Sequence, residues 1–396
     1  MKKIILLSIL ATSLFSCSNK ERIYYDLVIQ NVGLFDGLND KGVVNIGINA
    51  DTIALITDKI ILGDSVVDGT DKYLLPGLIN SHVHITSPKD LEESLNAGIM
   101  AVIDLHQSSE ERAASLRSYR DSTGYAYFLS SGFAGTLPGG HPTQYGAIET
   151  ISDSLTAEQW VQNRLKNGAD YIKIIRDGAP SPPDFQPIPT LNFEQIEDII
   201  KSAKGHNQLT IAHTASLEET IKIAQLGIDG FAHLWMGIDS ATAEQLAFLS
   251  DHDIFVIPTA QTQLQIWETK IEGGPPQIRE YAEQNLASMK MVQKEIAKLN
   301  EAGISILAGN DPPNFDIGYG NDLFIELDIY RKAGLSNIEV LKTVTSNPSK
   351  VFGIDEIGII SEGMSVNMIL IDGNPIEDLK YLTNVNHIWK NGVLVK

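Results

Sequence analysis

The sequence has little cysteine and a shortage of positive charge. Its 396 residues include one cysteine, so no disulfide can form within the chain. Lys and Arg number 30 against 50 Asp and Glu, which gives a formal net charge of -20. A surface with this excess of acid repels phosphate backbones, so we expect no nucleic-acid partner. The chain also has no low-complexity tract, and its 43% hydrophobic residues are ordinary for a globular protein.

The first residues have the pattern of a secretory leader. A basic start at residues 1–3 precedes an apolar run at 4–15 that is too short to span a membrane, and Ser16 is a small residue before Cys17. Residues 14–17 resemble a bacterial lipoprotein box, in which the cysteine is lipidated and becomes the mature N-terminus. We therefore expect a signal peptide at 1–16, a lipid on Cys17, a tether at 17–22 and a membrane-anchored protein of a bacterial cell envelope. A plain cleaved signal peptide is the alternative.

Both remaining ends of the chain are rich in short strand patterns. Residues 25–32, 43–48, 52–56, 368–371 and 387–395 are apolar or alternating runs separated by Asp-Gly and Asn-Gly turn signals. The sequence therefore predicts one β-sandwich domain made of residues 23–76 and 355–396.

Between the two ends, strands and helices alternate. Apolar strands are expected at 99–104, 125–131, 170–175, 208–213, 228–234, 254–258 and 304–308, with helical segments between them. Together with the strand that carries His82 they form eight strand–helix units, which predicts a (β/α)8 TIM barrel over residues 77–354. An open, doubly wound sheet is the alternative, but no glycine-rich phosphate turn follows the first strand.

Six residues at or near the ends of these strands are metal-ligand candidates. They are His82, His84, Lys173, His213, His233 and Asp311. The carboxyl ends of parallel barrel strands meet on one face, and imidazole and carboxylate groups are typical zinc ligands. A lone histidine at such a position is more often a hydrogen-bonded core residue, but a His-x-His pair with two further histidines favours a metal site.

Lys173 and Asp311 each have two interpretations. An unmodified ammonium is repelled by metal ions, so Lys173 either forms an ion pair, for example with Asp177, or carries a CO2-derived carboxylate that bridges two metals. Asp311 either caps a turn or binds one ion and exchanges a proton with the attacking water.

The order of these residues resembles the amidohydrolase superfamily, in particular its binuclear members with a carboxylated lysine. The flanking stretches LLPGLINSHVH, NAGIMAVIDL, GGHP and TVTSNPSKVFG agree, and the likeness covers nearly all of residues 25–396. It is strongest to the branch with imidazolonepropionase-like proteins and prolidases. Asn310 departs from the threonine common in the family, which we expect to affect the rim of the active site.

The resemblance implies a specific set of ligands and cofactors. His82, His84 and Asp311 would hold one divalent ion of the zinc type, His213 and His233 a second, and carboxylated Lys173 would bridge them. Asp311 would also be the catalytic proton carrier.

Substrate contacts are expected from three residues. His141, after Gly139-Gly140, is expected to stabilise the oxyanion, unless it is a surface-loop histidine. Tyr145 and Arg176 are candidates for holding a substrate carboxylate, although Arg176 could equally pair with an aspartate such as Asp170.

Two neighbouring segments complete the expected pocket. His106, after the second strand, is expected to line it. Residues 261–277 are polar and contain Gly-Gly-Pro-Pro, which predicts a mobile lid.

These inferences predict an enzyme that hydrolyses an amide or peptide C–N bond of a small substrate, with a prolidase-like dipeptidase favoured. A cyclic amide or lactone hydrolase is the alternative. A non-catalytic surface-binding lipoprotein with the same fold is a further hypothesis, against which stands the complete ligand set. The sequence leaves the oligomeric state open, a homo-oligomer included.

Overall fold

The computed structural model describes residues 24–176, 188–214, 216–235, 239–276, 279–280, 282–283 and 289–396. The expected signal peptide at 1–16, the expected lipid site Cys17 and the tether at 17–22 lie outside these residues, as does Asp177. Within the described ranges, no helix has both the length and the apolarity needed to cross a membrane.

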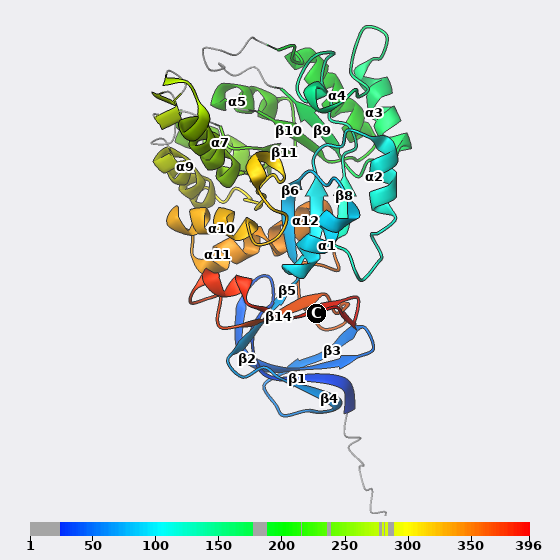
Figure 1. The fold of residues 1–396 in the computed structure, drawn as a ribbon, viewed down its shortest axis with the longest axis vertical. Helices are drawn as coiled ribbons and strands as arrows, with labels where there is room; N and C mark the ends of the chain where they lie inside the picture. The colour runs from blue at the N-terminus through cyan, green and yellow to red at the C-terminus, as the bar shows by residue number, and fades with distance from the viewer. Residues whose placement is uncertain are drawn as a thin grey trace, which may run out of the picture.

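Strands from the two ends of the chain share one sheet (Figure 1). Its order is β15-β14-β13-β5-β1-β2-β3, and β4 also pairs with β1. The two halves meet where β13 pairs antiparallel with β5. The strands are β1 (Tyr24–Phe35), β2 (Asp40–Asn49), β3 (Thr52–Thr57), β4 (Leu62–Asp68), β5 (Lys72–Pro76), β13 (Met368–Asp372), β14 (Val385–Lys390) and β15 (Val393–Leu394).

Apolar residues from both ends form the core of this sheet region. Val32 and Leu34 of β1 belong to one buried cluster with Leu74 of β5 and with Met368 and Leu370 of β13. Removing this apolar surface from water stabilises the joining of the two termini. The eight strands are connected as one branched sheet, so the predicted division into a two-layered sandwich is not confirmed.

The middle of the chain is an α/β structure with two parallel sheets. Their strands follow chain order, β6-β7-β8 in one and β9-β10-β11-β12 in the other. They are β6 (Leu78–Val83), β7 (Ile99–Asp104), β8 (Tyr127–Ser130), β9 (Ile172–Ile175), β10 (Thr210–His213), β11 (Gly230–Ala232) and β12 (Phe255–Ile257). All six residues of β7 are buried, as expected for a strand covered on both faces.

Helices connect the strands and surround them (Figure 1). They are α1 (Pro88–Asn96), α2 (Glu110–Arg117), α3 (Ala157–Lys166), α4 (Phe193–Gly205), α5 (Leu217–Gln225), α6 (Ala243–Asp251), α7 (Ala260–Gly273), α9 (Met289–Glu301), α10 (Leu323–Lys332), α11 (Asn337–Thr343) and α12 (Ser346–Phe352). Several begin at capping boxes, in which a side chain such as Thr156 or Asn192 accepts from the third backbone N–H of the helix.

The predicted strands overlap the observed ones except at 304–308, where only a bridge between Ile306 and Val256 is present. Residues 261–273 of the predicted lid belong to helix α7, and its first turn is buried, so the prediction of a mobile segment is wrong for that turn. For the remainder of the predicted segment it stays a prediction. Side-chain contacts with the strand ends, described below, hold that turn inside the protein.

Hydrogen bonds connect the two parallel sheets on both sides. On one side, Gly135 donates its N–H to Lys173 O at 2.8 Å. On the other, Leu307 donates to Val256 O at 3.0 Å, and Ser81 of β6 donates to Ala308 O at 2.8 Å. The carboxyl ends of β6, β10 and β11 are thereby brought to the same edge.

Candidate metal centre

His82 and His84 lie at the carboxyl end of β6, with their ring centroids 5.4 Å apart. His82 is 2% exposed, whereas the side chain of His84 is 27% exposed. The alternation of side chains along a strand places both rings on one face, as the sequence predicted.

Asp311 faces both histidines. Its Oδ1 lies 3.0 Å from His84 Nε2 and 3.3 Å from His82 Nε2. Candidate ligand atoms of these three residues all lie within 4.8 Å of one another, close enough to hold one metal ion. The backbone of Asp311 adopts φ +62°, which is uncommon outside glycine, and its N–H donates to His82 O at 2.9 Å. Such backbone strain is typical of functional sites.

His213 and His233 lie beside this group. His213 is the last residue of β10, and His233 follows β11. Their ring centroids are 4.5 Å apart, and the His233 ring is 4.8 Å from the His82 ring. The four predicted histidines, which come from three separate stretches of the sequence, are therefore gathered at one edge.

Lys173 is the second residue of β9, below the end of the strand, and its side chain reaches the same site. It is 2% exposed, and its Nζ is buried without a hydrogen-bond partner among the described residues. Burial lowers the pKa of this amine to about 7. Its charge in turn lowers the pKa of His82 and His213, where burial is the larger cause.

The donor set fits divalent metal ions. Imidazole nitrogens and a carboxylate converge, and His82 Nδ1 is buried without a partner among the described residues, like Lys173 Nζ. Burial lowers the pKa of His233 to about 3, so its ring is neutral, as a metal ligand must be. Burial alone would lower the pKa of His84, but its hydrogen bond with Asp311 raises it.

Further contacts orient the candidate ligands. His84 Nδ1 lies 3.1 Å from His106 O, and His233 Nδ1 lies 2.6 Å from Thr259 Oγ1. Bonds of this kind set which ring nitrogen is available to a metal. Asp104, at the end of β7, accepts from the N–H of Ile85 at 2.7 Å and so holds the chain just after His84. Burial raises the Asp104 pKa to about 6.

The first turn of α7 contacts both halves of the site. Besides the contact of Thr259 with His233, Thr262 Oγ1 donates to Asn310 O at 2.9 Å, next to Asp311. Glu326 of α10 holds this turn by accepting the N–H groups of Ala260 at 2.9 Å and Gln261 at 2.6 Å. Sequence reasoning missed Glu326, because an isolated acid on an amphipathic helix carries no sign that it is buried.

Asn310 does not lie at the active-site rim as expected. It is fully buried, and its side chain accepts from Asn80 at 2.7 Å and donates to Gln261 at 3.3 Å. Its departure from the family pattern therefore concerns the support of Asp311.

The three residues expected to contact the substrate have different surroundings in the structure. The His141 ring lies 5.4 Å from that of His213 and 6.0 Å from that of Tyr145. Tyr145 is 61% exposed, at the surface of the same loop. Arg176 forms an ion pair with Glu219 at 2.7 Å and lies over the Phe193 ring at 4.3 Å. The Arg176 guanidinium therefore already has an acidic and an aromatic partner. These contacts do not test whether it also binds a substrate carboxylate, and that role stays a prediction.

Arg176 does not pair with Asp170, the other partner considered. Asp170 forms an ion pair with Arg120.

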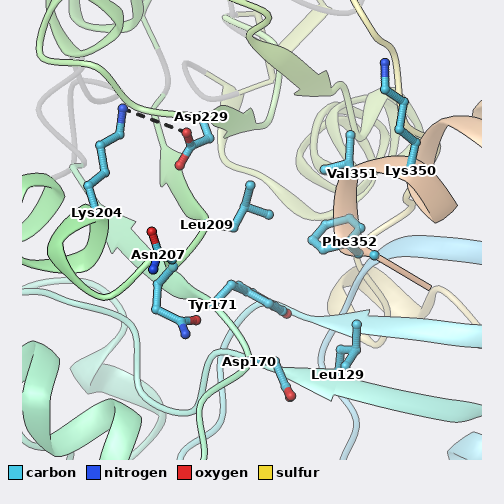
Figure 2. Close-up of a pocket in the computed structure, with 12 residues that line it drawn as sticks. Leu129, Asp170, Tyr171, Lys204, Asn207, Leu209, Asp229, Lys350, Val351 and Phe352 are labelled. Atoms are coloured by element: carbon cyan, nitrogen blue, oxygen red, sulfur yellow. Dashed lines mark ion pairs between the residues drawn. The ribbon is translucent and has the colours of Figure 1, made fainter. Parts of the chain in front are cut away.

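A hollow of about 700 Å³ lies away from the histidines, at the amino ends of the strands (Figure 2). Its lining includes Tyr171 before β9, Leu209 before β10 and Asp229 before β11. Asp229 accepts from Thr210 N at 2.8 Å and so supports the start of β10. The candidate metal ligands lie at the opposite, carboxyl ends of the strands, so we assign this hollow no catalytic role.

Comparison with known proteins agrees with the geometry. A sequence profile described as "Amidohydrolase family" matches residues 73–395, most of the chain. The chain belongs to the amidohydrolase family. It is therefore a hydrolase of carbon–nitrogen bonds, which confirms the prediction of an enzyme and the family resemblance.

Two relatives of this amidohydrolase are distant in sequence, and their alignments span most of each relative. Ochratoxinase of Aspergillus niger is 22% identical over 415 aligned positions, which cover 86% of this chain and 82% of the relative. Enamidase of Eubacterium barkeri is 22% identical, with 89% of each chain covered.

Solved structures show the same fold. A Xaa-Pro dipeptidase with bound methionine aligns with a TM-score of 0.77 and 23% identity, covering 93% of this amidohydrolase and 99% of the dipeptidase.

Proposed function

We propose that this amidohydrolase uses two divalent metal ions, of the zinc type, to hydrolyse an amide or peptide C–N bond of a small substrate. The observation that carries the proposal is the convergence of His82, His84 and Asp311 with His213 and His233. Within this class we favour a dipeptide substrate, because a Xaa-Pro dipeptidase shares the fold over 93% of the chain.

We assign His82, His84 and Asp311 to one ion, and His213 and His233 to the other. Bound ions of this kind polarise a substrate carbonyl and lower the pKa of water. Asp311 would accept the proton of the attacking water at its carboxylate and pass it to the leaving nitrogen. Its strained backbone and its bond to His82 O hold the carboxylate in one position for both transfers.

We propose that Lys173 carries a carboxylate formed with CO2. The amine nitrogen would form a bond with the carbon of CO2 and release one proton, giving an anionic bridge between the ions. The buried Nζ, which has no hydrogen-bond partner among the described residues, supports this proposal. Its pKa of about 7 leaves a large neutral fraction, the form that attacks CO2. An ordinary lysine in this position would leave a charge uncompensated.

We also infer a closed (β/α)8 barrel at residues 77–354, with a separate domain from 23–76 and 355–396. The hydrogen bonds at both seams between the parallel sheets support closure, and the shared sheet of the two chain ends supports the domain boundary.

For the N-terminus we propose a lipid on Cys17 and a place in the cell envelope, on the leader pattern alone. Radiolabelled fatty acid should enter the wild-type protein and not a Cys17→Ser variant. Equal labelling of both would overturn the anchor.

The test of the function is metal analysis followed by a substrate panel. We expect two equivalents of metal per chain. Turnover of a Xaa-Pro dipeptide or an N-acyl amino acid should be lost with a chelator and restored by zinc. His82→Asn should lose one equivalent, whereas His252→Asn, at an exposed helix end, should lose none.

Turnover of cyclic amides or lactones alone would favour the alternative substrate class. A chain that binds no metal would overturn the enzyme mechanism and favour a binding protein.

A further inference from the structure

His106 has a buried ring nitrogen, Nε2, that has no hydrogen-bond partner in the part of the chain that the structure describes. It follows the carboxyl end of β7, after Leu105, and is 8% exposed. Its ring centroid is 6.3 Å from that of His84, and its backbone oxygen is the partner of His84 Nδ1. The residue therefore lies at the edge of the candidate metal site.

The hydrogen-bond geometry determines the tautomer of His106. The N–H of Ala134 donates to His106 Nδ1 at 3.2 Å. A ring nitrogen that accepts a hydrogen bond carries no proton, so the proton of the ring is on Nε2. His106 Nε2 is buried and, among the described residues, has no hydrogen-bond partner. Such a group costs free energy unless something else accepts its bond.

The surroundings of the ring place it beside the candidate metal site. Burial is the main cause that lowers the pKa of His106, and the charges of His84, His141, Lys173 and Arg112 lower it further. Among the described residues, the ring is not in the group of His82, His84 and Asp311, whose ligand atoms lie within 4.8 Å of one another. An oxygen that gains negative charge during the reaction is an acceptor that such a buried N–H would stabilise.

We propose that His106 donates a hydrogen bond from Nε2 to the carbonyl oxygen of the scissile amide. This inference rests on the proposed function. When the water oxygen bonds to the carbonyl carbon, the π electrons of the C=O bond move onto that oxygen, and the proton of the water goes to Asp311. In this proposal the His106 N–H faces the resulting oxyanion. A preorganised donor of this kind stabilises the transition state more than the bound substrate.

Two substitutions at this position separate the donor from the shape of the ring. His106→Phe keeps a planar ring and removes both nitrogens, whereas His106→Gln restores an N–H group near Nε2. The bond to His84 comes from the backbone oxygen, so neither substitution removes it. His252→Phe is the matched control, because His252 is exposed at the C-terminal end of α6.

The first readout is the steady-state kinetics of the zinc-loaded variants on the Xaa-Pro and N-acyl amino acid panel. Losing one oxyanion donor costs about 10²–10³ in kcat. We therefore expect His106→Phe to lower kcat and kcat/KM equally by about 100-fold with little change in KM, and His106→Gln to recover part of the loss. A raised KM with normal kcat would overturn the assignment, because it would indicate ground-state binding only.

The second readout needs no turnover. Methylphosphonate carries its oxygens on a tetrahedral phosphorus, as the reaction intermediate carries its oxygens on a tetrahedral carbon. Its affinity for the zinc-loaded protein can be measured by calorimetry. We expect His106→Phe to bind methylphosphonate about 10-fold more weakly, since losing a hydrogen bond of about 1.4 kcal/mol raises the dissociation constant about tenfold. His252→Phe should keep the wild-type affinity. Unchanged affinity would overturn the assignment, as would loss of a zinc equivalent, which would make the ring a ligand.

Different results would refute the proposed function and the role of His106. If the wild-type protein turns over no member of the panel, the proposed function fails, while methylphosphonate affinity still decides whether His106 donates into the site.

Discussion

The buried carboxylate of Glu326 gives a prediction about stability that the structure makes quantitative. It lies on α10, is fully buried, and accepts two backbone N–H groups from the first turn of α7. Burial raises its pKa from 4.5 to about 7. Replacing it by glutamine, Glu326→Gln, keeps the size of the side chain and removes its titration.

The sign follows from the raised pKa. The folded protein holds the proton of Glu326 more tightly than the unfolded chain does. The stabilisation from this proton is complete below pH 4.5 and is lost as the pH rises through about 7. The pKa difference of about 2.5 corresponds to roughly 3 kcal/mol, at about 1.36 kcal/mol for each pH unit. The wild type therefore loses about 3 kcal/mol between pH 4 and pH 8 that the glutamine variant keeps.

The assay is urea unfolding of both proteins at several pH values between 4 and 8. Other titrating groups act equally on both proteins and cancel in the difference. We expect the free energy of unfolding of Glu326→Gln, relative to the wild type, to rise by about 3 kcal/mol over this range.

Asp328→Asn is the matched control on the same helix. Asp328 pairs with Arg331 and Lys332, and these bonds lower its pKa, although burial acts against them. Asp328 stays ionised from pH 5 upward. The difference in free energy of unfolding between Asp328→Asn and the wild type should therefore be constant above pH 5. A constant difference for Glu326→Gln over the whole range would refute the reasoning. A change of the opposite sign would mean that the ionised carboxylate stabilises the first turn of α7.

Three further predictions concern the site and the contact between the chain ends and the α/β part. Lys173→Ala should bind fewer than two metal equivalents after dialysis, with partial recovery in acetate; unchanged occupancy would refute a bridging lysine. Asp311→Asn should lower kcat by about 10²–10⁴ while the circular dichroism is unchanged, and near-normal turnover would exclude a proton carrier. Lys390→Met should lower the free energy of unfolding by about 2–4 kcal/mol, because Lys390 Nζ donates to the backbone oxygens of Ser122 and Tyr125. An unchanged urea midpoint would show that these bonds contribute nothing.

Much of the fold could be predicted because local patterns are strong in this chain. Buried strands such as β7 are nearly pure apolar runs, and helices such as α3 begin at a capping residue three positions before a glutamine. A strand was predicted at 304–308 where the structure has only a bridge. An apolar run indicates that residues are buried, but it does not show that their backbone pairs with a neighbouring strand. The lid prediction was wrong for the first turn of α7, because polar side chains predict exposure, whereas here Thr262 and Gln263 donate to the backbone oxygens of Asn310 and Leu234.

The candidate ligands could be predicted for a chemical reason. Few residue types bind zinc-like ions, and His82 and His84 are two apart on a strand, which fixes their common face. Supporting residues offer no such signal. Glu326 is 66 and 65 positions from the two N–H groups that it accepts, and nothing in its own neighbourhood reveals them.

The sequence by itself determined the family, the alternation of strands and helices, and the residue types that are able to bind metal. These depend on side-chain chemistry and on short-range periodicity, which are properties of neighbouring residues. Only the tertiary structure decided that Arg176 is occupied by Glu219, that the buried Asn310 side chain bonds to Asn80, and that His106 Nε2 is buried without a hydrogen-bond partner among the described residues. Each of these depends on which distant groups compete for the same donor or acceptor, and that competition exists only once the chain has folded.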